Sequence, residues 1–290
     1  MPLPPILNYP HHVHLPRIPR DVAARGIRTR IIQSGSGYPL VLIHGFLSNH
    51  HTFDDIAPTL ANSFQLIAVD LPGSGDSEKP SPNRFNYSVE AFAEVVTDVI
   101  AALHVGRCHV IGHGFGCAVA LALASEHPEF VDHLALASPD FIPRRQPPLT
   151  RFMRFPIVGG FLFKQILGRS LFQSLFLKHL YAPAHVIPTD RANLYYTPLL
   201  EPAARESSFA TLPALLDTRP TIARLTRIKS PTLVLWGRAD HMVSADIAPR
   251  FVRQLRNARL AYIDSGYSPH EETPELFIAS LNQFFQQPQR

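Results

Sequence analysis

Residues 112–116, GHGFG, have the outline of a nucleophile elbow, the G-x-S-x-G turn that lifts a serine hydroxyl above a sheet. Small residues on either side of the nucleophile relieve crowding between the strand before this turn and the helix after it. The nucleophile position here is Gly114, which has no side chain. The chain therefore has a frame for acyl-transfer chemistry without the atom that would attack the substrate.

Strands and helices alternate along most of the chain, and short apolar runs bounded by turn residues mark the strands. Ser88 is a suitable N-cap for an amphipathic helix that runs to about Leu103. The alternation predicts an α/β fold, a mostly parallel sheet with helices on both faces. The predicted strands are residues 26–35, 39–45, 64–70, 107–113, 131–140, 230–240 and 259–266.

The composition is that of a large folded domain with an insertion: 290 residues, of which 46% are hydrophobic and 17% charged. The formal net charge is +4, but the arginines are scattered and no nucleic-acid motif accompanies them, so no nucleic-acid partner is expected. Cys108 and Cys117 fall in predicted buried elements, which indicates a reducing, cytoplasmic compartment without disulfides. No stretch reaches the ~18 apolar residues of a membrane span.

Residues 1–20 contain six prolines and predict a loosely structured arm. Its three histidines, His11, His12 and His14, lack the second set of ligands that a closed metal site requires. We interpret them as part of a polar tail and expect no metal and no cofactor.

Residues 141–224 interrupt the alternation of strands and helices. The segment has helical apolar spacing and no buried-strand pattern, which predicts a helical cap inserted into a core formed by residues 21–140 and 225–290. Its interleaved phenylalanines and basic residues would also suit peripheral contact with a membrane surface. We favour phenylalanines that line an apolar pocket, because a lid over a buried site needs the same amphipathic pattern.

Five motifs occur in an order and spacing that resemble the α/β-hydrolase superfamily, in particular its cap-bearing branch of epoxide hydrolases, haloalkane dehalogenases and carbon–carbon bond hydrolases. The resemblance covers residues 26–287 and implies an eight-stranded-type sheet, a catalytic triad and an oxyanion hole. The motifs are residues 44–46 (HGF), 70–77 (DLPGSGDS), 112–116 (GHGFG), 236–240 (WGRAD) and 266–275 (GYSPHEETPE).

Carried over position by position, the resemblance implies an incomplete triad. Asp240 stands at the acid position, whereas Gly114 replaces the nucleophile and Tyr267 replaces the histidine. The oxyanion-hole donors would be the backbone N–H groups of Phe46 and Phe115, which need no particular side chain.

Other residues near the expected site are weighed as substitutes or ligand contacts. His270 follows Tyr267 by three residues and is a possible substitute base, although packing within its loop is the favoured interpretation. His113 is the second candidate base, and His44 is expected to line the ligand pocket with it. We expect Asp140, after the sixth core strand, to be a solvated loop residue at the mouth of the pocket.

Three hypotheses about function follow. The first is a non-hydrolytic protein that binds a hydrophobic small molecule, or promotes a cyclisation, elimination or isomerisation, in a pocket with a bare Gly114 floor and a Tyr267 hydroxyl that reaches Asp240 or the ligand. The second is a hydrolase or lyase for a small hydrophobic ester, epoxide or carbon–carbon substrate, with His270 or His113 as relocated base. The third is a scaffold or membrane-surface interaction protein.

Overall fold

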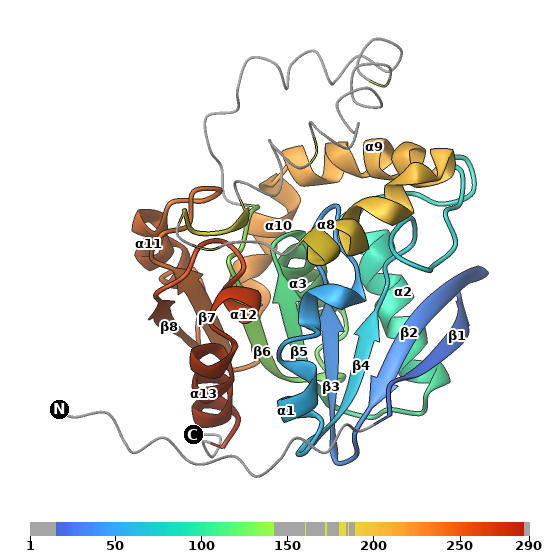
Figure 1. Ribbon diagram of the computed structural model, residues 1–290. Coiled ribbons are helices and arrows are strands. Elements are labelled where there is room, and N and C mark those ends of the chain that lie inside the picture. The colour runs from blue at the N-terminus through green and yellow to red at the C-terminus, as the bar shows by residue number, and fades with distance from the viewer. Residues whose placement is uncertain are drawn as a thin grey trace, which may run out of the picture.

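An eight-stranded sheet forms the centre of the protein, with the strand order β1-β2-β4-β3-β5-β6-β7-β8 (Figure 1). The computed structural model describes residues 16–141, 160, 172, 180–183, 185 and 189–286. β1 pairs with β2, and β2 with β4, in antiparallel fashion, and all other neighbouring strands are parallel. The strands are β1 (Ile18–Ala24), β2 (Ile27–Ser34), β3 (Tyr38–Ile43), β4 (Phe64–Val69), β5 (Cys108–His113), β6 (Val131–Ala137), β7 (Thr232–Gly237) and β8 (Ala258–Ile263). The predicted α/β architecture is confirmed.

Helices cover both faces of this sheet. The α-helices are α1 (Ala57–Leu60), α2 (Val89–Ala102), α3 (Phe115–Glu126), α8 (Thr189–Tyr196), α9 (Pro202–Leu216), α10 (Arg219–Arg224), α11 (Ala248–Val252), α12 (Pro269–Glu272) and α13 (Pro274–Phe285). Short 3-10 helices are η1 (His50–Phe53), η3 (Thr197–Leu200), η4 (Leu225–Arg227) and η5 (Ala245–Ile247). The N-cap prediction for α2 is confirmed, since the Ser88 side chain accepts a hydrogen bond from the backbone N–H of Ala91.

Two apolar cores lie on opposite sides of the sheet because successive side chains of a strand point to opposite faces. In β3, Val41 and Ile43 join the core under α2 and α3, whereas Leu40 and Leu42 join the core under α1 and α13. The central parallel strands are buried on both faces, as their continuous apolar sequences predicted.

Residues 18–20, which the sequence prediction places in the N-terminal arm, instead begin β1. β1 lies at the edge of the sheet and pairs only with β2. An edge strand tolerates Pro19, because a proline there removes an N–H that has no partner strand to bond. Residues 1–15, including the three histidines of the arm, lie outside the described residues.

The described part of the predicted cap, residues 189–224, consists of α8, η3, α9 and α10. α8 and α9 lie across the carboxyl ends of the strands (Figure 1). Side-chain hydrogen bonds join both helices to the core. Asn49 Nδ2 donates to the Leu194 carbonyl of α8 at 2.9 Å, and the hydroxyls of Tyr87 and Ser207 of α9 lie 2.7 Å apart. Most of residues 142–188 lies outside the described residues, so the division into arm, core and cap stays a prediction.

None of the helices in the described part of the chain combines the length and the apolar character that a transmembrane helix needs.

Candidate active site

The turn between β5 and α3 has the backbone of a nucleophile elbow. Gly114 adopts φ 53° and ψ −117°, a conformation that favours glycine, and α3 begins at the next residue. A Cβ on Gly116 would overlap the Ile43 carbonyl oxygen of β3, and one on Gly112 would overlap the backbone of α3. The glycines thus let strand and helix pack as the sequence predicted.

The phenol of Tyr267 fills the space where a nucleophile would stand. A Cβ built on Gly114 would overlap the Tyr267 hydroxyl oxygen and lie 3.5 Å from Asp140 Oδ2. The Tyr267 side chain follows β8 and is 4% exposed. The expected bare glycine floor is therefore wrong, because the ring that replaces the histidine is long enough to cover the elbow.

Tyr267 is held by Asp140 at this site. Its hydroxyl donates to Asp140 Oδ2 at 3.0 Å, across 127 residues of sequence. Burial, then the charges of Asp140 and Asp240, raise the pKa of Tyr267 well above its usual value, so the phenol stays protonated. Asp140 is 7% exposed, which contradicts the solvated loop residue that we expected. The contact with Tyr267 draws this carboxylate inward.

Asp240 stabilises the loop after β7. Its Oδ1 accepts hydrogen bonds from the backbone N–H groups of Met242 and Val243, both at 2.8 Å. The Tyr267 hydroxyl, predicted to reach Asp240 or a ligand, makes its hydrogen bond to Asp140 instead, although the Asp240 charge still acts on it. Two carboxylates therefore flank the position of the missing histidine.

Both candidate bases are buried and engaged in hydrogen bonds. His113 Nε2 donates to the Tyr267 carbonyl at 3.0 Å, and burial lowers the pKa of His113 to about 4. His270 is 0% exposed, and its Nε2 lies 2.7 Å from Thr52 Oγ1. Burial, then the proximity of His113, lowers the pKa of His270 well below its usual value. His270 thus packs against Phe53 and His113, and its role as a substitute base stays a prediction.

His44 holds two loops together beneath the site. Its Nδ1 donates to the Gly45 carbonyl at 2.8 Å, and its Nε2 accepts from the backbone N–H of Leu71 at 3.0 Å. Burial lowers the pKa of His44, so the ring is neutral in this arrangement.

Two small cavities lie at the carboxyl ends of the strands, and both are lined by Gly45, Phe46 and Leu47. The first extends to Phe115 and α9, with His44 in its wall. The second contains His113 and Tyr267 in its wall. Phe46, Phe115, His44 and His113 thus line cavity space, and their roles as oxyanion-hole donors or ligand contacts stay predictions.

Two non-glycine residues at this edge of the sheet have left-handed backbones: Leu47 at φ 55° and Ser138 at φ 45°. Such conformations cost about 1–3 kcal/mol each and persist where the surrounding structure imposes them. Ser138 follows β6 directly, and Leu47 lies in the loop after β3 and lines both cavities, so the backbone strain lies at the rim of the predicted site.

Sequence reasoning missed Glu271, a buried carboxylate in the wall of the second cavity. It accepts hydrogen bonds from Thr52 Oγ1 (2.6 Å), Tyr181 Oη (2.6 Å) and Tyr195 Oη (2.9 Å), and Arg191 lies 3.8 Å away. Burial raises the pKa of Glu271, and these partners offset the effect only in part. Glu271 therefore joins the core to the cap segment.

The neighbouring Glu272 has a different role. Its carboxylate accepts from the backbone N–H groups of Ala182, Gly266 and Ser268. In the sequence these residues are simply two adjacent glutamates. No sequence signal distinguishes Glu271, in the cavity wall, from Glu272, which accepts hydrogen bonds from backbone N–H groups.

Comparisons with known proteins agree with this geometry. A family model described as the alpha/beta hydrolase fold matches residues 38–274. The chain is 30% identical to a 2-hydroxymuconate semialdehyde hydrolase of Pseudomonas sp. (strain CF600), covering 84% of this chain and 85% of that protein. It is 26% identical to a soluble epoxide hydrolase of Corynebacterium sp. (strain C12), covering 90% and 94%.

Among solved structures, a putative acyltransferase from Salmonella enterica superposes with a TM-score of 0.81 at 26% identity, covering 92% of this chain and 94% of the other. The matched region extends from β3 into α13 and includes the elbow, the Asp240 loop and the Tyr267 loop. The resemblance inferred from the five motifs is confirmed, and the chain belongs to the α/β-hydrolase fold family.

Proposed function

We propose that this protein is a non-hydrolytic member of its family that binds a hydrophobic small molecule at the former triad cleft without forming a covalent intermediate. One observation carries the proposal: the Tyr267 hydroxyl occupies the space above Gly114 and is hydrogen-bonded to Asp140. This arrangement fills the position of the nucleophile with a group that stays protonated.

Covalent hydrolysis needs a nucleophile and a base that takes its proton. Gly114 supplies no nucleophile, and burial leaves His113 and His270 weakly basic. The relocated-base hypothesis is therefore disfavoured. An oxyanion hole and substrate binding alone give about 10³–10⁴-fold acceleration over water in triad-less enzymes, which limits the chemistry to reactions that need only orientation and polarisation.

The second cavity has the composition of a small-molecule site. Phe46, Leu47 and Leu180 provide apolar walls, and Thr52 and Glu271 provide polar groups at one side. Mostly apolar walls with few polar groups suit a hydrophobic ligand that carries one hydrogen-bonding group. The retained strain at Leu47 and Ser138 supports this use of the site.

The catalytic half of the proposal is tested with a fluorophosphonate probe. We expect no labelling of the purified protein, because Gly114 stands at the nucleophile position and the candidate bases near it, His113 and His270, are buried. The Gly114→Ser/Tyr267→His variant serves as the positive control. Stoichiometric labelling of any serine, located by peptide mass spectrometry, would refute the proposal.

The binding half is tested with N-phenyl-1-naphthylamine, whose fluorescence rises in apolar sites. We expect saturable binding that Phe46→Trp weakens about 10-fold, since the larger ring enters both cavities; this corresponds to about 1.4 kcal/mol. Leu276→Trp is the control, because Leu276 is 50% exposed on α13. Absence of saturable binding, or equal binding by the two variants, would contradict a ligand site here.

A further inference from the structure

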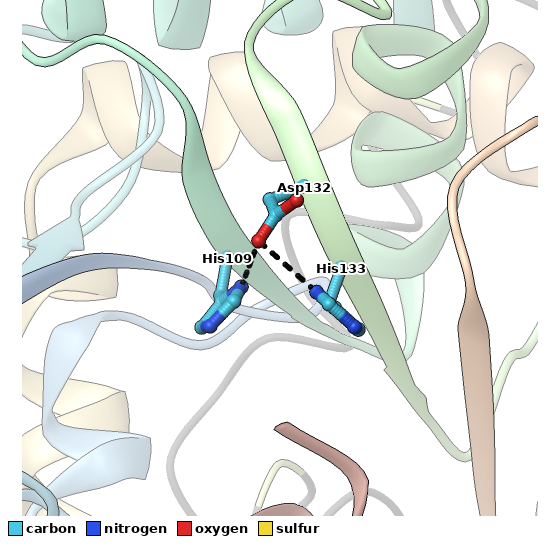
Figure 2. A group of neighbouring side chains, drawn as sticks. All are labelled: His109, Asp132 and His133. Atoms are coloured by element: carbon cyan, nitrogen blue, oxygen red, sulfur yellow. Dashed lines mark hydrogen bonds and ion pairs between the residues drawn. The ribbon is translucent and has the colours of Figure 1, made fainter. Parts of the chain in front are cut away.

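We propose that His109, Asp132 and His133 form a binding site for a divalent transition-metal ion, with Zn²⁺ as the best match (Figure 2). The three side chains lie near the amino-terminal ends of β5 and β6. The elbow and the triad positions are at the opposite, carboxyl-terminal ends, so the metal site is separate from the ligand cleft.

An irregularity in strand pairing brings the three residues together. Cys108 pairs with Val131 and Val110 pairs with Leu134, so Asp132 and His133 on β6 both lie opposite His109 on β5. In a β-bulge, two residues of one strand lie opposite a single residue of its partner strand. The bulge disturbs the strict alternation of side chains between the two faces of the sheet. Adjacent residues of β6 can therefore face the same imidazole, as Figure 2 shows.

The distances match the spacing of zinc ligands. Asp132 Oδ2 lies 3.1 Å from His133 Nδ1 and 3.5 Å from His109 Nδ1. Tetrahedral Zn²⁺ with bonds of about 2.0–2.1 Å places its ligand atoms about 3.3 Å apart. All three ligand atoms lie within 4.8 Å of one another. Small rotations of the two rings would bring both nitrogens to bonding distance.

The chemical state of His109 suits a metal ligand. Its side chain is 8% exposed, and its Nδ1 is buried with no hydrogen-bond partner among the described residues. A buried polar nitrogen without a partner is costly, and a metal ion would satisfy it. An imidazole nitrogen in this position is a common ligand of Zn²⁺.

Aromatic packing holds both rings in place. His109 stacks on Phe285 with centroids 4.3 Å apart and planes at 5°, and His133 meets the edge of Phe284. Ligand rings that are already oriented lose less freedom when the metal binds. A metal here would also tie β5 and β6 to the packing of α13.

One neighbouring charge opposes the metal. Arg107 lies 3.5 Å from Asp132 Oδ1, and its side chain is 53% exposed. It contacts the other carboxylate oxygen, so Oδ2 stays directed at the two imidazoles. Three protein ligands leave a fourth position for water.

The test uses the full chain without an affinity tag, dialysed against a chelator, in a background with His11, His12 and His14 changed to alanine. Co²⁺ is titrated and followed by its visible d–d absorption, and Zn²⁺ affinity is measured by competition with a chromophoric chelator. We expect one equivalent of metal to bind, and Zn²⁺ to raise the melting temperature.

Asp132→Asn and His133→Gln are each expected to weaken Zn²⁺ binding by about 100-fold or more and to abolish the rise in melting temperature. His127→Gln, outside the cluster, is the matched control and should bind as the background protein does. Near-UV circular dichroism checks that the variants fold. If His133→Gln does not fold, the isosteric Asp132→Asn variant still tests the proposal.

Two outcomes would overturn the proposal. If the background protein binds no stoichiometric metal, the cluster is no metal site, and Asp132 serves only the hydrogen bond with His133 and the ion pair with Arg107. If metal binds but Asp132→Asn leaves the affinity unchanged, the ion occupies another place. Neither result bears on the ligand cleft, whose tests use different probes.

Discussion

Gly114→Ser alone is expected to destabilise the protein by about 2–6 kcal/mol, and Tyr267→His is expected to relieve much of that loss. The serine Cβ would overlap the Tyr267 hydroxyl oxygen, and overpacking of this kind costs about 1–3 kcal/mol. A non-glycine residue at φ 53° adds about 1–3 kcal/mol. The imidazole of Tyr267→His is shorter than the phenol, so it removes the overlap. Only the cost of the left-handed backbone at residue 114 then remains.

Tyr267→His alone also has a cost, because the hydrogen bond to Asp140 is lost or remade. A buried group left without its partner costs about 1–3 kcal/mol. Urea unfolding of the wild type, both single variants and the double variant should therefore give a favourable coupling energy of about 1–3 kcal/mol. Additive losses would mean that the phenol does not block the elbow.

The double variant is also expected to gain esterase activity on p-nitrophenyl acetate that neither single variant has. Each single variant lacks one part of the catalytic pair, because Gly114→Ser has no base beside the serine and Tyr267→His has no nucleophile beside the imidazole. Gly114→Ala/Tyr267→His is the matched control, since it has the same steric change but no hydroxyl. A double variant that folds but stays inert would show that the oxyanion loop at Phe46 no longer supports acyl transfer.

Local features of this protein could be predicted because each depends on a few adjacent residues. The elbow at Gly114 follows from three glycines with fixed spacing, which allow strand and helix to approach closely. The helix cap at Ser88 follows from one hydroxyl before an apolar pattern. Apolar runs predicted the strands β2 to β8 along the chain for the same reason, whereas β1 was missed.

Features that depend on long-range contacts could not be predicted in this way. Asp140 and Asp240 both follow core strands, and only the fold decides which one binds Tyr267. The bulge that gathers residues at His109 is a property of register between two strands. Glu271 differs from its neighbour Glu272 only through its partners in the fold: hydroxyls from the core and the cap segment reach Glu271, whereas backbone N–H groups reach Glu272.

Lowering the pH from 7 to 5 is expected to destabilise the protein by at least about 3 kcal/mol. Four buried histidines have lowered pKa values in the fold, with those of His109 and His113 at about 4 and those of His44 and His270 also below the usual value. The unfolded chain protonates its histidines below about pH 6.5. Between pH 6.5 and 4 the unfolded state therefore binds more protons, and stability falls as the pH falls.

The buried carboxylates do not cancel the loss of stability that the histidines cause between about pH 6.5 and 4. Asp54 and Asp70 have lowered pKa values, so their contribution to stability is lost only as the pH falls through and below about 4. Glu271, whose pKa is raised, has the opposite sign and adds stability as it takes up a proton above its unfolded pKa. Glu271 therefore offsets part of the effect of the four histidines, and the unfolded chain still takes up more protons than the folded protein as the pH falls.

Urea unfolding at steps from pH 7.5 to 5.0, in the presence of a metal chelator, measures this slope directly. Each protonating imidazole contributes up to about 1.4 kcal/mol per pH unit. His113→Asn and His270→Gln should each reduce the slope by about one proton, whereas His241→Gln, at an exposed position, should leave it unchanged. A free energy of unfolding that stays constant over this range would mean that the buried imidazoles accept protons without loss of structure, and that the packing of His113 against Tyr267 and His270 tolerates charge.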